Sequence, residues 1–367
     1  MEAGVGRMAN QDTAYRRMLN QRIMWENPIE PGEVIQRLGA MQAQDYGQAL
    51  WGIGLRTQNK DAADVERAIA DKRIVLTWAM RGTLHLVPAA DVKWMLALLA
   101  PRIVAKQQRR LEQLGIDDEL VAFCEVLLYD ALTGHWRLSR PNLMKLLEEA
   151  GVETRNQRGY TLLWILAQKG LICHGPLEDK QQTFVLLDEW VQDHNRLSVE
   201  QSLVTLALRY FTGHGPATLH DFVWWTGLTV AEAKRGLEAA APSLVSEKID
   251  GVPYWMGMEQ VGRAEREPFV CLLPGYDEYL LGYKDRGAVL EAERAPLLVQ
   301  GSNGVFAPML VIDGQIEGIW KRTIKKKAIE LSIQPFSELG ERKEHVLEAA
   351  ARYSRFLGLP ISRIDFA

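Results

Sequence analysis

The sequence predicts an α+β, helix-rich fold of tandem winged-helix (helix-turn-helix) units followed by a β-rich C-terminal domain. Three helical segments and then a strand pair occur twice in succession, the N-terminal portion repeats this order with insertions, and strand-like runs predominate near the C-terminus. The predicted domains are a winged-helix-like unit (1–98), a basic linker helix (99–118), a second winged helix (119–196), a third (197–262) and a β-rich domain with a closing helix (263–367).

The second unit shows the pattern most clearly. Its first helix has apolar residues at steps of three and four, namely Leu120, Phe123, Cys124, Leu127, Leu128 and Ala131. PNLMKLLEEAG predicts a second helix that ends at Gly151, and RNQRGYTLLWILAQKG predicts a third with Thr154 as its N-cap. LICHG and QTFVLLD then predict two strands.

The third unit follows at once. QSLVTLALRYF, GPATLHDFVWWTG and TVAEAKRGLEAA predict three helices, and LVSEKIDGVPYWM predicts a hairpin that turns at Asp250-Gly251. In the first unit, TAYRRMLNQRI, PGEVIQRLGAMQAQ and DAADVERAIADKR predict helices, and IVLTWAM and TLHLVP predict strands around Arg81-Gly82. Two complete copies in succession make an accidental pattern improbable.

Two further segments complete the prediction. APRIVAKQQRRLEQLG predicts a basic helix with Arg102, Lys106, Arg109 and Arg110 on one face. VFAPMLVIDG, QIEGIWKRTI and KKKAIELSIQPF predict a three-strand meander, and ERKEHVLEAAARYSRFLG predicts the closing helix.

Composition excludes several classes of protein. The 367 residues include 47% hydrophobic and 25% charged residues, which rules out a disordered tail, and the three cysteines are too far apart for a disulfide framework. No stretch has the signal-peptide pattern or the roughly 18 apolar residues of a membrane span, so we expect a soluble, cytoplasmic protein without a membrane partner. A net charge of −4 gives no general attraction to polyanions, so any contact with nucleic acid must be local.

The familiar cofactor motifs are absent from the sequence. The seven histidines do not pair with each other or with cysteines at metal-ligand spacing. Neither phosphate-binding glycine pattern occurs, nor does the G-x-S-x-G nucleophile motif. We therefore expect no metal and no cofactor.

The most unusual segment is RLGAMQAQDYGQALWGIGLR. In an extended chain Gln42 and Gln44 project to the same side, so their amides can hold one water or one sugar oxygen between them. The alternative is that they cap the helix end and satisfy loop backbone groups. A glutamine does not titrate usefully, so the pair can position a nucleophile or stabilise developing charge but cannot act as a strong base.

Other polar residues form two kinds of candidate site. Arg81, Thr83 and His85 lie beside a glycine turn, where alternation places Thr83 and His85 on the polar face of a half-buried strand. A packing role for the histidine is the alternative. Five positive residues also lie between two predicted strands, namely Lys321, Arg322, Lys325, Lys326 and Lys327. They form either a solvated hairpin tip or a hairpin that contacts phosphate. Arg155 and Arg158 lie where a winged-helix recognition helix would begin.

Three segments, MQAQDYGQALWGIGLR, TWAMRGTLHLVPAAD and LLPGYDEYLLGYKDR, give the chain a resemblance to the AlkZ-like winged-helix DNA glycosylases over nearly its whole length. That resemblance implies three tandem winged helices in a C-shaped scaffold, with a β-rich part that completes a DNA channel. It also implies excision of alkylated purines, including N7-alkylguanine, from double-stranded DNA, with interstrand crosslinks unhooked by some members.

By the same resemblance, Gln42 and Gln44 match the catalytic Gln-x-Gln motif. Asp45 follows the motif and is not assigned the base role found in the Gln-x-Asp subgroup. Thr83 and His85, with Arg81, are expected near the site, and the basic hairpin and basic helix are expected on phosphates. The motif region contains no lysine that would suggest lyase chemistry, so we expect a monofunctional enzyme. We also expect a monomer that is associated with the bacterial nucleoid.

The third matching segment contains Asp277, Tyr283 and Arg286, for which a buried structural ion pair is favoured over catalysis. Two other functions remain open from the sequence. Winged helices are common in non-enzymatic transcriptional regulators, although these usually carry one such unit, and they also serve as protein-interaction scaffolds. A scaffold would show no salt-dependent DNA binding.

Overall fold

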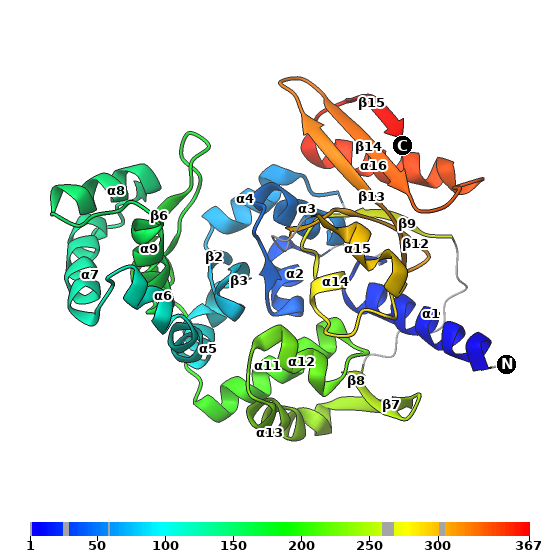
Figure 1. Cartoon of the computed structure of the whole chain (residues 1–367), viewed down its shortest axis with the longest axis horizontal. Helices are drawn as coiled ribbons and strands as arrows, with labels where there is room; N and C mark the ends of the chain where they lie inside the picture. The colour runs from blue at the N-terminus through cyan, green and yellow to red at the C-terminus, as the bar shows by residue number, and fades with distance from the viewer. Residues whose placement is uncertain (1, 25–28, 58, 259–267, 301–304) are drawn as a thin grey trace. The chain divides into compact units, whose positions relative to one another are not determined.

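The computed structural model describes residues 2–24, 29–57, 59–258, 268–300 and 305–367 (Figure 1). These residues form two compact units. Unit 1 comprises Met1–Val65, Leu203–Trp225 and Thr229–Ala367, and unit 2 comprises Glu66–Ser202 and Thr226–Leu228. Helices alternate with antiparallel hairpins and a mixed sheet, which confirms the helix-rich α+β prediction.

Unit 2 contains the second predicted winged helix. Its elements are α7 (Asp118–Leu132), β4 (Leu138–Ser139), α8 (Arg140–Glu149), α9 (Arg158–Gln168), β5 (Ile172–His174), β6 (Thr183–Leu186) and α10 (Leu187–Trp190). β6 pairs antiparallel with both β4 and β5. The buried face of α7 consists of Val121, Cys124, Leu128 and Leu132, whereas Phe123 is exposed.

The predicted N-cap of the third helix in this unit was wrong. α9 begins at Arg158, and its N-cap is Gln157, whose φ of 70° places it in the left-handed region. The hydroxyl of Thr154 instead donates to Glu148, and its carbonyl accepts from the Gly159 amide. The RNQR segment therefore forms a turn before the helix instead of its first turn.

The N-terminal portion has the predicted strand pair and three predicted helices, with one additional helix inserted. Its elements are α1 (Glu2–Asn20), α2 (Pro31–Leu38), β1 (Met41–Gln42), α3 (Tyr46–Arg56), α4 (Ala62–Ala70), β2 (Ile74–Trp78), η1 (Met80–Gly82), β3 (Leu84–Pro88) and η2 (Ala89–Asp91). The additional helix is α3. The second predicted helix was too long, because α2 ends at Leu38 and Met41–Gln42 forms a strand. Within unit 2 the strands follow the order β3-β2-β5-β6-β4, so the strand pair of the first repeat joins the hairpin of the second.

The basic linker is two helices, not the single helix that the sequence predicted. α5 (Val92–Lys106) ends before Gln107, and α6 (Gln108–Gln113) follows it. Gln107 has φ −97° and ψ 1°, outside helical geometry. Arg102 and Lys106 thus belong to one helix and Arg109 and Arg110 to the next, so one continuous face does not join them.

The third predicted winged helix lies in unit 1 except for residues 197–202 and Thr226–Leu228, which belong to unit 2. Its elements are α11 (Val199–His214), α12 (Leu219–Thr226), α13 (Val230–Ala240), η3 (Ala241–Ser243), β7 (Leu244–Ile249) and β8 (Val252–Gly257). Asp250 and Gly251 both have positive φ, 47° and 80°, which is the turn geometry that Asp-Gly favours. The predicted inner face of α11 is buried, at Leu203, Leu206, Ala207 and Tyr210.

The C-terminal part of unit 1 is a five-stranded sheet in the order β15-β14-β13-β12-β9, against which α16 packs (Figure 1). Its elements are β9 (Val270–Leu273), α14 (Glu278–Leu281), η4 (Ala292–Arg294), α15 (Ala295–Leu298), β10 (Val299–Gln300), β11 (Val305–Phe306), β12 (Met309–Ile312), β13 (Gln315–Ile324), β14 (Ile329–Pro335), α16 (Arg342–Leu357) and β15 (Ile361–Phe366). The meander and closing helix are confirmed. β9 and β15 were not predicted, and β15 runs parallel to β14 because α16 forms the crossover.

Nothing in the sequence indicated that α3 is a helix, because Gly52 and Gly54 lie in its interior, where glycine is unfavourable. Both lie in close packing, which is tightest at Gly54. A side chain at Gly54 would meet the Phe356 ring of α16 at 2.2 Å, and one at Gly52 would meet the Met41 sulfur at 3.1 Å. No helix in the described part of the chain is both long and apolar enough to cross a membrane.

The core of unit 2 makes its stability depend on pH. His174 of β5 is buried between the rings of Trp78 and Phe184, at centroid distances of 4.9 and 4.5 Å, and burial lowers its pKa from 6.5 to about 3. The unfolded chain binds this proton more readily, so the free energy of unfolding falls as pH decreases from 6.5 towards 3, by about 1.4 kcal/mol per pH unit.

Between about pH 7 and about pH 5, His174 should lower the free energy of unfolding of the wild type by roughly 2 kcal/mol. We predict that His174→Phe abolishes this contribution. Chemical denaturation of both proteins at the two pH values measures the change in free energy of unfolding with pH. Because each protein is compared with itself at the other pH, any repacking cost of the new ring cancels. The exposed His220 provides the control, because His220→Gln should retain the wild-type dependence. Equal pH dependence in wild type and His174→Phe would contradict the assignment.

Candidate functional site

The Gln-x-Gln segment is short, extended and held between two helices. Met41 and Ala43 are buried, Gln42 is half-buried and Gln44 is exposed, an alternation that matches two glutamines on the accessible side of an extended chain. The C-cap of α2 is Gly39, and the N-cap of α3 is Asp45, whose carboxylate accepts from the Gln48 amide at 3.0 Å. Residues other than the two glutamines therefore cap these helix ends.

Glu278, the first residue of α14, fixes the backbone of this segment. Its Oε1 accepts from the Gln42 amide at 2.9 Å, and its Oε2 accepts from the Trp225 indole at 2.8 Å. His214 lies 3.4 Å from the same Oε2, and both side chains are fully buried. A buried carboxylate with several donors has a fixed position, so it holds Gln42 at a defined place in the fold.

Directly beside Glu278, Asp277 forms a fully buried ion pair with Arg56 at the end of α3. The guanidinium meets the carboxylate in a fork, with Nη1–Oδ2 at 2.9 Å and Nη2–Oδ1 at 2.8 Å. Its remaining N–H groups donate to the Gln21 carbonyl, the Gln21 side chain and the Gly52 carbonyl at 2.8–2.9 Å. A buried structural ion pair is therefore present at Asp277, as expected, but its partner Arg56 lies outside the third matching segment.

α3 is joined to the C-terminal part along its length. The Gly275 amide donates to the Gln48 side chain at 3.2 Å, and the Trp51 indole donates to the Leu272 carbonyl at 2.7 Å. Tyr276, in the same loop as Gly275, has a φ of 62°, a strained conformation for a residue with a side chain. Burial and the negative charge of Asp45 raise the pKa of Tyr276. The loop before α14 thus packs on the first turn of α3.

The predicted basic hairpin is confirmed, as β13, a four-residue turn and β14. Arg322 lies at its side, and its Nη2 contacts both carboxylate oxygens of Asp45 at 3.2 Å, so the hairpin is linked to the residue after the Gln-x-Gln motif. Lys325 pairs with Glu330 across the turn. Lys321, Lys326 and Lys327 are exposed, and the side chain of Ile324 at the tip is 52% exposed.

In unit 2 the structure corrects the expectation for the second matching segment. β3 is not half-buried: four of its five residues are buried, and His85 is 0% exposed. Thr83 lies before the strand, where its hydroxyl donates to the Met80 carbonyl at 3.2 Å and its own carbonyl is 2.8 Å from His85 Nδ1. The turn places Arg81 in the left-handed region, with φ 55°.

The basic residues of unit 2 differ in exposure. Lys106, Arg109, Arg110 and Arg155 are exposed, whereas Arg102 and Arg158 are half-buried. The guanidinium of Arg158 donates to the carbonyls of Leu114, Gly115 and Glu153 at 2.8–3.1 Å, so it fixes the loop after α6.

Sequence reasoning missed the residues that position the motif. Arg56 and Glu278 were not singled out, although Asp277 and Glu278 are adjacent acids within an apolar run, LLPGYDEYLLGY, and buried acids require partners. Tyr283 is also buried, where its hydroxyl donates to the His214 carbonyl at 2.6 Å and burial raises its pKa. Arg286 donates to the Leu280 carbonyl at 3.1 Å and lies 5.1 Å from the Phe306 ring.

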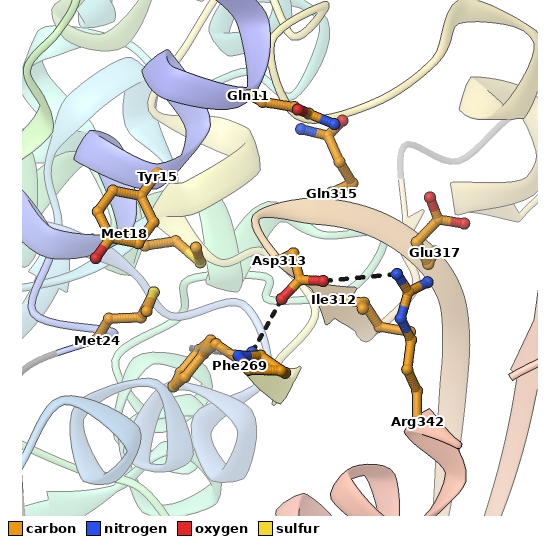
Figure 2. A pocket seen from close by; sticks show the side chains of 11 residues that line it. Gln11, Tyr15, Met18, Met24, Phe269, Ile312, Asp313, Gln315, Glu317 and Arg342 are labelled. Carbon is orange, nitrogen blue, oxygen red and sulfur yellow. Dashed lines mark hydrogen bonds and ion pairs between the residues drawn. The ribbon is translucent and has the colours of Figure 1, made fainter. Parts of the chain in front are cut away.

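A separate hollow of about 370 Å³ lies in unit 1 between α1, the β12–β13 turn and the start of α16 (Figure 2). Asp313 in this turn accepts from the Phe269 amide at 2.9 Å and lies 3.8 Å from Arg342. The lining contains neither glutamine of the motif. Within the described ranges, no group of three or more His, Cys, Asp or Glu residues is arranged to hold a metal ion.

Comparison with known proteins gives concordant results. The family model for "DNA glycosylase AlkZ-like" matches residues 35–356. The interstrand DNA cross-link repair glycosylase of Streptomyces sahachiroi is 26% identical over 339 residues, which cover 87% of this chain and 88% of that protein. The solved structure of Streptomyces sahachiroi DNA glycosylase AlkZ superposes with a TM-score of 0.81 at 25% identity, over 98% of this chain and 99% of that one.

The buried ion pair makes a quantitative prediction. Asp277→Ala should lower the free energy of unfolding by about 3–5 kcal/mol, because the Arg56 charge then remains buried without its partner. Chemical denaturation measures the loss. Replacing both partners by apolar residues, Arg56→Met with Asp277→Leu, should recover much of it.

As a control, Lys234→Gln removes one partner of the exposed Lys234–Glu238 pair in the same unit. It should change the free energy of unfolding by less than about 0.5 kcal/mol. A loss below about 1 kcal/mol for Asp277→Ala would contradict the assignment of the pair as a buried interaction that stabilises the fold.

Proposed function

The chain belongs to the AlkZ-like DNA glycosylase family, and we propose that it excises N7-substituted purines, unhooks interstrand crosslinks and uses Gln42 and Gln44 as its catalytic pair. Family membership makes the protein an enzyme, in place of the transcriptional regulator or the scaffold that winged helices alone would also allow. The lesion and the roles of the two glutamines are the proposal.

The observation that supports the catalytic role most directly is the way the motif is held. The Gln42 amide is bound by buried Glu278, and Asp45, just after the motif, caps α3 and pairs with Arg322. A short extended segment fixed at both ends keeps its side chains oriented before substrate binds. Such preorganisation lets neutral groups contribute to catalysis, because little reorganisation remains for the reacting state.

The chemistry requires no strong acid. An N7-alkylated guanine is cationic, so its glycosidic bond is already weakened and the base departs without protonation. Two amides can hold a water near the anomeric carbon and stabilise an oxocarbenium-like sugar through positioning and electrostatics. Asp45 is engaged with Arg322 and the α3 backbone, in keeping with a structural role for its carboxylate.

The proposal that the protein unhooks crosslinks is supported by its similarity, over 87% of this chain, to a protein named an interstrand DNA cross-link repair glycosylase. Opening one strand of a crosslink uses the same bond cleavage as excision of a simple adduct. We therefore propose one site for both reactions, in a monofunctional enzyme that leaves an abasic site.

DNA is proposed to contact basic residues on both units. In unit 1 these are the hairpin residues Lys321, Arg322, Lys325, Lys326 and Lys327, and in unit 2 they are Arg102, Lys106, Arg109, Arg110 and Arg155. Arg158 is not among them, because its guanidinium is bound to three backbone carbonyls. Thr83 of unit 2 is proposed to contact DNA, whereas His85 is fully buried in that unit and is assigned no role. We propose a monomer that acts in the cytoplasm at the nucleoid.

The catalytic proposal is tested by excision. Gln44→Ala, and likewise Gln42→Ala, should lower release of N7-methylguanine from duplex DNA at least about 100-fold, the usual cost of losing one group that stabilises the reacting state. Unhooking of a nitrogen-mustard crosslink should fall in parallel. DNA affinity should be retained, and thermal unfolding of each variant checks that the fold is intact.

Gln36→Ala is the matched control, since Gln36 is an exposed glutamine on α2, and it should retain wild-type excision. Undiminished activity in a Gln42→Ala, Gln44→Ala double variant would eliminate the catalytic role. If the wild-type protein binds duplex DNA but releases no N7-methylguanine and unhooks no crosslink, the proposed substrate class is wrong.

The role of the basic hairpin is tested by salt dependence. Lys326→Gln with Lys327→Gln should reduce the slope of log K against log salt by about 0.9 for each of the two lysines that binds a phosphate, up to nearly 2. Fluorescence anisotropy with a duplex oligonucleotide measures this. Lys145→Gln with Lys234→Gln removes equal charge at two exposed sites elsewhere, and should leave the slope unchanged. Equal slopes for the two double variants would refute a specific role of the hairpin in DNA binding.

A further inference from the structure

Unit 2 contains a hollow of about 210 Å³ that the Gln-x-Gln site does not involve. It lies where the turn between β2 and β3, the break between α5 and α6, and the first turns of α9 meet. The side chains that line it include Arg81, Gln107, Arg110, Tyr160, Thr161 and Trp164. All of them belong to one compact unit.

The lining has the chemistry of an anion site. Among the described residues that form it, two are arginines and none is an acid. Tyr160 and Thr161 lie in the first turns of the eleven-residue helix α9, whose N-terminal partial positive charge favours an anion. A third guanidinium, that of Arg140, lies 6.0 Å from the Tyr160 ring. The hollow therefore combines full and partial positive charges around an aromatic ring.

The site is built before any ligand arrives. The Trp164 indole donates to the Gly82 carbonyl at 3.0 Å, which ties the β2–β3 turn to α9. The Trp78 indole donates to the Tyr160 hydroxyl at 3.0 Å and fixes that ring, although Tyr160 remains 37% exposed. Arg81 is held in the left-handed region within the same turn, a strained conformation of the kind that persists at functional positions.

The break between the two basic helices also contributes residues to the lining of this hollow. Gln107 is the residue at which α5 ends and α6 begins, and both it and Arg110 line the hollow. Arg109, their neighbour on α6, does not. The segment at the α5–α6 break therefore contributes Gln107 and Arg110 to the lining.

The size of the hollow identifies the kind of ligand. At about 210 Å³ it is smaller than the roughly 300–1,000 Å³ of pockets that enclose a whole small molecule, so it suits one group of a larger one. We propose that it binds a single backbone phosphate of the DNA strand, with Arg81, Arg110 and the start of α9 around the phosphate and the Tyr160 ring against the adjoining deoxyribose. This deepens the proposed function and rests on it in one respect, that the polyanion is DNA.

Arg110 and Lys145 provide a test and its control within unit 2. Arg110→Ala should weaken binding of a duplex oligonucleotide about tenfold near 0.1 M salt, and should reduce the salt slope by about 0.9, because one phosphate is no longer neutralised by the protein. Lys145→Ala removes one positive charge from an exposed position of the same unit that is given no DNA contact, and it should leave both quantities nearly unchanged. Arg110→Lys keeps the charge and should retain most of the slope.

Tyr160 tests the second part of the site by a different signature. Tyr160→Leu should weaken binding about fivefold or more without changing the salt slope, because an aromatic contact releases no counterions. Tyr160→Phe keeps the ring and should bind nearly as well as the wild type. Thermal unfolding of each variant identifies any loss of affinity that arises from misfolding.

Equal losses of affinity in Arg110→Ala and Lys145→Ala, or an unchanged salt slope in Arg110→Ala, would overturn the phosphate site. Equal affinity of Tyr160→Leu and wild type would overturn the role of the ring. Both results are independent of the proposed function, which is judged by excision with the wild-type protein. Normal excision with no effect at Arg110 would refute this inference alone.

Discussion

The buried pair between Arg56 and Asp277 is the interaction on which the site in unit 1 depends. Two charges in a protein interior are stable together only when their geometry is good and their other hydrogen-bonding groups are satisfied. Here all the N–H groups of the guanidinium have acceptors, and Asp277 also accepts from the Tyr279 amide at 2.8 Å. The pair therefore fixes the end of α3 against the start of α14, segments more than two hundred residues apart in sequence.

That constraint explains how an uncharged motif can be positioned for chemistry. With Asp277 held by Arg56, the next residue, Glu278, is directed to the Gln42 amide and the Trp225 indole. On the other side of the motif, Asp45 begins α3 and binds Arg322 of the β13–β14 hairpin. The glutamines thus occupy a short extended segment between two anchored acids, and a proposed DNA-binding hairpin is joined directly to that segment.

Positive charge is also concentrated at particular places in the fold. The net charge of −4 gives no general attraction to DNA, but exposed lysines gather at the hairpin of unit 1 and arginines gather around a hollow in unit 2. Other cations are used inside the fold, as Arg56 and Arg158 are. Local placement, and not the total, decides where a polyanion can bind.

The sequence by itself determined the repeated helix–helix–helix–hairpin order, the Asp250-Gly251 turn, the basic hairpin and the Gln-x-Gln motif, because each depends on local periodicity or turn chemistry. Only the tertiary structure decided the rest. α3 is helical despite two glycines because α16 and Met41 pack against them, and β15 is a strand because it lies beside β14. Likewise, the burial of His85 and the partners of Asp277 and Glu278 follow from contacts between distant segments, which no local pattern encodes.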